Sequence, residues 1–152
     1  MTEKNRAQLA SSDSSHFQLH AQLENDSLFV AKLTLCEVRL MRTHELEWLL
    51  LVPRLMNIRE LTDVSEANQQ LLWQEIRLCT RALQACFNPH KTNIAMLGNM
   101  VEQFHVHIIA RYKDDPAWPK PVWGNVEIQK LPADQWDPII QKIQDFLTFH
   151  FT

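Results

Sequence analysis

The strongest constraint on the fold is an uninterrupted apolar run, Trp48–Val52 (WLLLV), which is closed by Pro53. A short continuous run of this kind is typical of a strand that is buried on both faces. We therefore expect it to form the centre of a sheet. The chain has 152 residues, which is enough for one domain with a sizeable core.

Further strand patterns lie on both sides of this run. Gly98-Asn99 separates the last two patterns and predicts either a turn between antiparallel strands or a bend leading into one. The four segments are Leu28–Lys32, Leu35–Met41, Lys91–Leu97 and Val101–Arg111.

Helical spacing is clearest between Glu66 and Phe87, where Ser65 can cap the helix and Asn88-Pro89 ends it. A second amphipathic helix is predicted over Ala133–Phe151, with Pro138 in its first turn. His16–Leu23 reads as a short helix or an irregular lead-in. Strands, one long helix and more strands together predict an α+β domain with an antiparallel sheet.

Composition excludes several classes of function. The formal net charge is −3, which argues against broad binding to nucleic acid or to an anionic membrane. No apolar run is long enough to span a membrane, and the polar segment 1–15 is not a secretory signal. The three cysteines lack metal-type spacing and read as small apolar residues in a reducing cytosol. We expect a cytoplasmic protein with a flexible arm over 1–15 and a single domain over 16–152.

The segment Val101–Arg111 carries the most reactive pattern in the chain. Side chains of a strand alternate between its faces, so Gln103, His105 and His107 share one face. The opposite face is apolar and is expected to join the core. Two imidazoles spaced i, i+2 stand side by side and can touch the same small group. The polar face is therefore expected to be open to a ligand or to solvent.

Neutral imidazole is a nucleophile at physiological pH and needs no separate base. Its attack on phosphorus gives a phosphoramidate that water can break, while the second histidine donates to an oxygen of the phosphate or to the leaving group. The backbone amides of Gly98 and Asn99 could hold the remaining charge. The pattern thus predicts a centre that attacks or holds a phosphate of a nucleotide.

Two other interpretations of the histidines remain open. They could be polar residues on a solvated strand face. We favour this interpretation less, because two histidines lie together on one face beside a glutamine. They could also bind a metal, since His-x-His on a strand is a recurrent ligand pair. A third ligand would be needed, and His20, His44 and His90 have no spacing that recommends them.

Two tryptophans lie in the proline-rich segment Asp114–Gly124 that follows the histidines. Trp118 and Trp123 could wall a base pocket by stacking. They could instead pack the loop onto the sheet or onto a second subunit, and we favour this packing role.

The segment Gln103–Ile109 (QFHVHII) resembles the signature of the histidine triad family, His-φ-His-φ-His-φ-φ, where φ is apolar. Trp48–Arg54 (WLLLVPR) is similar to the family's apolar strand that ends in proline. Asn93–Arg111 and Ala117–Gly124 look like a short bacterial branch often labelled diadenosine-polyphosphate hydrolase-like. The resemblance covers roughly Phe17–Gly124.

The resemblance implies an α+β fold: a five-stranded antiparallel sheet, one long helix packed on it and a C-terminal helix, usually in a homodimer. It also implies hydrolysis or transfer at the α-phosphate of a nucleotide or dinucleotide, through a covalent nucleotidyl-histidine and without a cofactor or metal. Diadenosine polyphosphates and nucleoside phosphoramidates are the implied substrates. By position, His105 matches the nucleophile and His107 the phosphate contact. Gly98 and Asn99 match the supporting loop.

This chain departs from the family pattern at two positions. Gln103 replaces the first histidine, and a glutamine can hydrogen-bond near the phosphate in its place. Arg42 lies where the family often has an asparagine that contacts ribose, and we expect Arg42, like Gln103, to bind the nucleotide or its phosphate. The first departure keeps a second interpretation open, namely a nucleotide-binding regulatory module with little catalysis.

Overall fold

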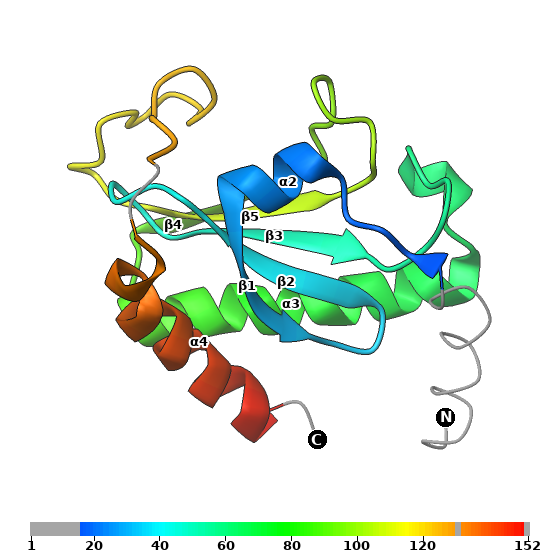
Figure 1. Cartoon of the computed structure of the whole chain (residues 1–152). Coiled ribbons are helices and arrows are strands. Elements are labelled where there is room, and N and C mark those ends of the chain that lie inside the picture. Colours follow the sequence, from blue (N-terminus) through cyan, green and yellow to red (C-terminus); the bar gives the residue numbers. More distant parts are fainter. Residues whose placement is uncertain (1–15, 130–131, 151–152) are drawn as a thin grey trace.

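The computed structural model describes residues 16–129 and 132–150, and for residue 133 it describes the backbone alone. The predicted arm over 1–15 lies outside the described residues. Five strands form one antiparallel sheet in the order β1-β2-β3-β5-β4 (Figure 1), which confirms the predicted fold class. The strands are β1 (Ser27–Lys32), β2 (Cys36–Met41), β3 (Trp48–Pro53), β4 (Lys91–Ala95) and β5 (Val106–Arg111).

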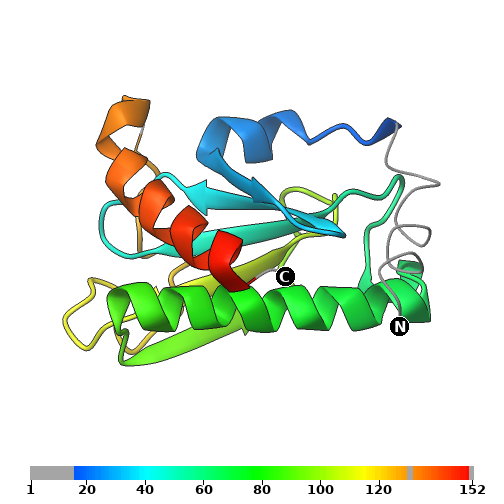
Figure 2. The ribbon, with the colours of Figure 1, turned by 90° about the horizontal axis from the view of Figure 1, so that it is seen from below.

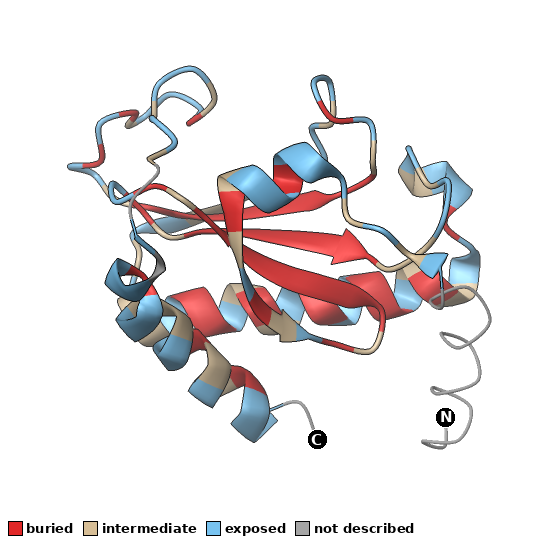
Figure 3. Cartoon of the chain, viewed as in Figure 1, coloured by how far each residue is buried: buried red, intermediate tan, exposed pale blue. Residues whose placement is uncertain are grey.

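The apolar run is the middle strand of the sheet, as predicted. Every residue of β3 is buried, and β2 and β5 pair with it on either side (Figure 3). Its side chains alternate between two hydrophobic clusters. Leu49 and Leu51 join the cluster beneath α3, whereas Trp48, Leu50 and Val52 join the cluster on the opposite face.

Two helices cover the first of these faces. The long helix α3 (Glu66–Phe87) begins after Ser65, whose side chain accepts from Asn68 N, and ends at Asn88 in the left-handed conformation. Its contacts run to β3, β5 and the C-terminal helix α4 (Asp137–His150), which also contacts β1. Figure 2 shows α3 along one side of the sheet and α2 on the other.

The C-terminal helix starts later than the sequence analysis predicts. Ala133–Gln135 forms a short 3-10 turn, η3, and α4 begins only at Asp137. A helix that began at residue 133 would place Pro138 beyond its first turn, where the missing N–H breaks a backbone bond. Starting at Asp137 keeps the proline in the first turn, where it is tolerated.

The other face of the sheet carries the shorter α2 (Ala21–Asp26) and the loop after β5. The buried residues of this side form a second cluster: Leu23, Met41, Leu46, Trp48, Leu50, Val52, Val101, Ile109, Ala117 and Val122. This cluster surrounds the histidines described below. No helix among the described residues combines the length and the apolar character needed to cross a membrane.

Candidate functional site

The histidine segment is a strand only in part. We predicted a strand over Val101–Arg111, but β5 begins at Val106, and the last pair of the ladder joins Ala95 to His107. Residues 96–105 form a loop between β4 and β5. This loop is bound to the segment after β3 by a hydrogen bond from Phe104 N to the carbonyl of Ile58 (2.9 Å). Alternation along the sequence predicts a strand but cannot show where the segment lacks a partner strand.

The two histidines are close together and buried. Their ring centroids lie 4.7 Å apart at an interplanar angle of 71°, and each residue is 5% exposed. This face is therefore not solvated, but both histidines line a cavity, which leaves the expected opening to a ligand as a prediction. Phe104, Val106 and Ile108 join the opposite core cluster, as predicted.

Hydrogen bonding fixes the tautomer of His105. Its Nδ1 lies 2.6 Å from the carbonyl oxygen of Gln103. A carbonyl only accepts, so Nδ1 carries the proton and donates it. The lone pair is therefore on Nε2, which is the nitrogen available for attack on an electrophile.

His107 is fixed at both nitrogens. The indole Nε1–H of Trp48 donates to His107 Nδ1 at 3.0 Å, and an indole N–H has no acceptor capacity. The proton of the ring must then be on Nε2, which donates to the carbonyl of Leu97 at 3.0 Å. His107 is a neutral donor through Nε2, the opposite arrangement to that of His105.

Burial keeps both rings neutral at physiological pH. Burial lowers the pKa of His105, and the bond to the Gln103 carbonyl only partly opposes this effect. Burial, together with a smaller effect of the nearby His105, lowers the pKa of His107 to about 4, although the bond to the Leu97 carbonyl acts in the opposite direction. Neutral His105 is the nucleophilic form, so the site is ready to react without a base.

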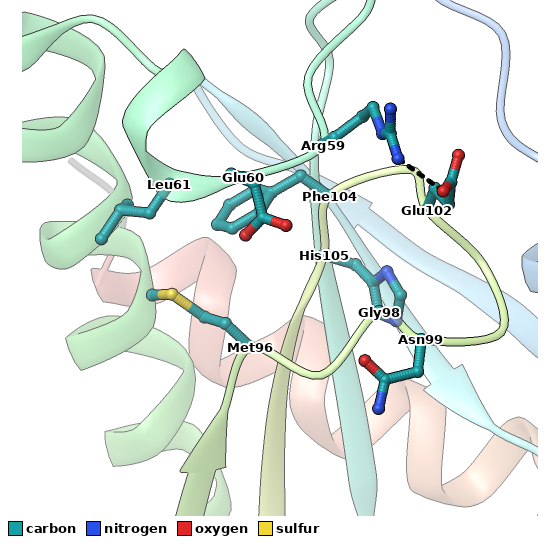
Figure 4. Close-up of a pocket in the computed structure, with 9 residues that line it drawn as sticks. All are labelled: Arg59, Glu60, Leu61, Met96, Gly98, Asn99, Glu102, Phe104 and His105. Atoms are coloured by element: carbon teal, nitrogen blue, oxygen red, sulfur yellow. Dashed lines mark hydrogen bonds and ion pairs between the residues drawn. The ribbon is translucent and has the colours of Figure 1, made fainter.

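A polar cavity of about 410 Å³ opens on one side of His105. Figure 4 shows the His105 ring beside Gly98 and Asn99, with Glu60 across the cavity. Arg59 and Glu102 form an ion pair of 2.5 Å at its rim, where both side chains are about two-thirds exposed.

A second cavity of about 480 Å³ reaches both histidines and is mainly apolar. Trp48 and Trp123 contribute to its wall, and Trp123 meets the His107 ring edge-on with centroids 5.1 Å apart. Of the described residues that line this cavity, Asp26 alone has a formal charge at neutral pH. A flat apolar group with polar substituents fits such a lining.

Gly98 and Asn99 lie where the sequence predicts. Asn99 lines both cavities, and Gly98 lines the polar one. A Cβ added at Gly98 would lie 3.0 Å from the carbonyl oxygen of Val101 and 3.8 Å from His105 Cε1. The contact with the His105 ring would be an ordinary van der Waals contact, so it is the close approach of the Val101 carbonyl that favours glycine at this position.

Neither Gln103 nor Arg42 lines the two cavities beside His105. The amide of Gln103 bonds to the backbone of Gln18 and His20 in the segment before α2. Arg42 follows β2, and it lines neither of the two cavities beside His105, whereas its neighbour Met41 lines the apolar one. Their proposed contacts with the substrate stay predictions.

The loop after β5 is held by one buried guanidinium, that of Arg111. Arg111 is 1% exposed and bonds to both carboxylate oxygens of Asp115, to Asn93 Oδ1 and to the carbonyl of Lys120. Its guanidinium carbon also lies 5.6 Å from the centre of the Trp118 ring. Trp118 thus packs the loop, as favoured, whereas Trp123 also lines the apolar cavity.

The histidines proposed as third metal ligands have other surroundings. His20 caps α2, accepting from Gln22 N at 3.1 Å, and His44 stacks on Trp136 with centroids 4.2 Å apart. His90 lies edge-on to Trp118. Within residues 16–129 and 132–150, no group of three His, Cys, Asp or Glu side chains could hold a metal ion.

Comparison with known proteins assigns the family. The HIT domain model matches residues 22–114, and the chain therefore belongs to the HIT, or histidine triad, family. Members of this family are generally nucleotide-binding proteins, hydrolases or transferases. No curated protein matches the chain at a significant level.

Three solved structures of histidine triad proteins are similar over most of the chain. A protein of Sinorhizobium meliloti 1021 has 36% identity and a TM-score of 0.84, covering 88% of this chain and 99% of its own. One of Bradyrhizobium japonicum has 39% identity and a TM-score of 0.81, covering 85% and 96%. One of Marinobacter aquaeolei VT8 has 38% identity and a TM-score of 0.83, covering 88% and 97%.

Proposed function

We propose that the chain is a nucleotide hydrolase or nucleotidyl transferase that acts at the α-phosphate through a covalent bond to His105. The observation that carries the proposal is the bond from His105 Nδ1 to the Gln103 carbonyl, which leaves the Nε2 lone pair beside two cavities. The apolar cavity accepts the nucleoside, and the polar cavity accepts the leaving group. Diadenosine polyphosphates and nucleoside phosphoramidates are the proposed substrates.

In the first step, the His105 Nε2 lone pair forms a bond to phosphorus, and the bond from phosphorus to the leaving group breaks. The leaving group takes that electron pair and a proton from solvent. The modified ring is cationic, and the Gln103 carbonyl, which accepts from Nδ1–H, stabilises its charge. In the second step, water or another acceptor attacks phosphorus, the P–N bond breaks, and the acceptor's proton passes to solvent.

His107 supports these steps as a hydrogen-bond donor. Its Nε2–H, which now donates to the Leu97 carbonyl, can donate instead to an oxygen of the phosphate. The backbone amides of Gly98 and Asn99 are proposed as further donors. Gln103 and Arg42, which we predicted to bind the nucleotide, are not needed for either step.

The nucleoside side of the proposal rests on the lining of the apolar cavity. Trp123 and Trp48 offer aromatic surface for a base, and Asp26 offers a carboxylate. Carboxylates accept hydrogen bonds from the paired hydroxyls of a ribose. We propose that Asp26 performs this role, because Arg42, at the position where the family often has the ribose contact, does not line this cavity.

The test is a trapping experiment with diadenosine tetraphosphate and with adenosine 5′-phosphoramidate. Wild-type protein should turn over at least one of them and show an adenylyl adduct by intact-mass spectrometry after acid-free quenching. His105→Ala should lose turnover by roughly a thousandfold and lose the adduct. His150→Ala, at the exposed end of α4, is the matched control and should behave as wild type. Equal turnover by wild type and His105→Ala would refute the proposal.

A regulatory binding module is the second candidate. It is favoured by Gln103 in place of the first histidine of the triad and by the engagement of both nitrogens of His107. Tight binding of adenosine 5′-monophosphate without turnover or adduct would select it.

We also propose a homodimer. The strand β4 lies at the edge of the sheet with β5 as its neighbour, and Ile94 on it is 44% exposed. An exposed edge of this kind can pair with a second copy. Light scattering coupled to size exclusion should give twice the mass of the chain, and a monomer at micromolar concentration would refute this assembly.

A further inference from the structure

We propose that Gln103 is a positioning residue that holds α2 against the histidine segment and so shapes the apolar cavity. This inference rests on the proposed function for its effect on nucleotides, although its structural part stands alone. It differs from the role that the triad signature gives to this position, since the side chain points away from the phosphate site.

The two bonds of the Gln103 amide resemble the pairing of a neighbouring strand. Its Oε1 accepts from His20 N at 2.9 Å, and its Nε2 donates to the carbonyl of Gln18 at 2.9 Å. The backbone groups of residues i and i+2 are thus satisfied by one side chain, 83 and 85 residues away in the sequence. In the reverse orientation the amide NH2 would face the N–H of His20, and the amide oxygen would face the carbonyl of Gln18. The two bonds therefore fix the orientation of the amide.

The segment that Gln103 binds, residues 18–20, leads directly into α2, which lines the apolar cavity. His20 is the N-cap of α2, and its Nδ1 accepts from Gln22 N at 3.1 Å. Gln22, Leu23 and Asp26 of the same helix line the apolar cavity. An isolated helix of six residues is unstable in water, so its place depends on such anchors.

The same residue also contacts the nucleophile, but through its backbone. The Gln103 carbonyl accepts from His105 Nδ1 at 2.6 Å, and any side chain at this position leaves that carbonyl in place. The next residue is fixed from the other side by the bond from Phe104 N to the Ile58 carbonyl. The side chain therefore governs the cavity wall, while the backbone governs the tautomer of His105.

The test uses two variants. Gln103→Ala removes both bonds, whereas Gln103→Glu keeps an acceptor for His20 N but places a second oxygen against the carbonyl oxygen of Gln18. Gln70→Glu, at an exposed position of α3, is the control. The first measurement is hydrogen exchange of the amides of residues 20–26. We expect it to accelerate by about tenfold in Gln103→Ala, by less in Gln103→Glu and not in the control. Unchanged exchange in Gln103→Ala would overturn the proposal.

The second measurement separates positioning from catalysis. For turnover of adenosine 5′-phosphoramidate, KM should rise by about tenfold in Gln103→Ala, while kcat stays within about twofold of wild type. A collapse of kcat with unchanged exchange would mean that Gln103 contacts the phosphate, which overturns the proposal. If the wild type neither binds adenosine 5′-monophosphate nor turns over any substrate, the proposed function fails. In that case the hydrogen-exchange result still tests whether the Gln103 side chain holds α2.

Discussion

The indole N–H of Trp48 donates to Nδ1 of His107 at 3.0 Å, and this bond determines which nitrogen of His107 can serve a substrate. Trp48 and His107 lie on neighbouring strands, β3 and β5, and Leu50 is the direct partner of His107 in the ladder. Because an indole can only donate, His107 cannot accept a second proton without losing this bond. At neutral pH the residue is therefore a neutral Nε2–H donor.

Replacing Trp48 by phenylalanine should release the tautomer of His107. The aromatic surface is largely kept, but Nδ1 loses its donor and can take a proton. We expect the pKa of His107 to rise and kcat/KM for the proposed substrates to fall by about tenfold. Ring-nitrogen NMR shifts would report the tautomer directly. Trp73→Phe, at a 53% exposed site on α3, is the control, and identical spectra for wild type and Trp48→Phe would contradict the expectation.

Stability should fall with acid because of His107. Its pKa is about 4 in the folded chain against an ordinary value of 6.5, so the unfolded chain binds the proton first as the pH falls. Stability is unaffected by this group above pH 6.5 and falls as the pH is lowered toward 4, where the loss in the free energy of unfolding reaches about 3 kcal/mol.

Carboxylates also titrate in this pH range, so the effect of His107 is measured as the difference between wild type and a variant that lacks this histidine. Urea unfolding of wild type and His107→Gln would be compared at pH 7 and pH 4.5. We expect the free energy of unfolding of wild type to fall more steeply over this interval. Parallel pH dependence of the two proteins would show that His107 is not titrating as its burial implies.

The fold could be predicted because its signals are local. The apolar run at Trp48–Val52 requires cover on both faces, and Ser65 and Asn88-Pro89 mark the ends of α3. The prediction that the strand starts at Val101 was wrong, and the reason is physical. Alternating apolar residues indicate a strand, but the registers of β3 and β4 decide where that strand has partners, and their last pairs with β5 are Leu51 with Val106 and Ala95 with His107.

The details of the site depend on contacts that are distant in the sequence. His105 and Gly98 could be found because the motif itself is short. The donor role of Trp48 could not, since its N–H meets His107 only through the register of β3 and β5. Gln103 could be recognised as a departure, but its bond to His20 joins segments 83 residues apart.

Arg111 should be essential for the loop that carries Trp123. Arg111→Lys keeps the charge but cannot hold Asp115 with two parallel bonds while also reaching Asn93. Because the pair is buried, we expect a loss of about 3 kcal/mol in the free energy of unfolding and weaker nucleotide binding. Arg59→Lys, in the exposed pair with Glu102, should cost less than about 1 kcal/mol. Urea unfolding of both variants tests this, and equal losses would contradict it.

Asp26 should determine the preference for ribose. Wild type is expected to bind adenosine 5′-monophosphate more tightly than its 2′-deoxy form, because a carboxylate accepts from the hydroxyl that the deoxy form lacks. In Asp26→Asn the two affinities should approach each other, with a loss of about tenfold for the ribonucleotide and little for the deoxynucleotide. Glu24→Gln, an exposed residue of the same helix, controls for the change of charge. Calorimetric titration of the four combinations gives the coupling between side chain and hydroxyl. If the discrimination survives in Asp26→Asn, another group recognises the ribose.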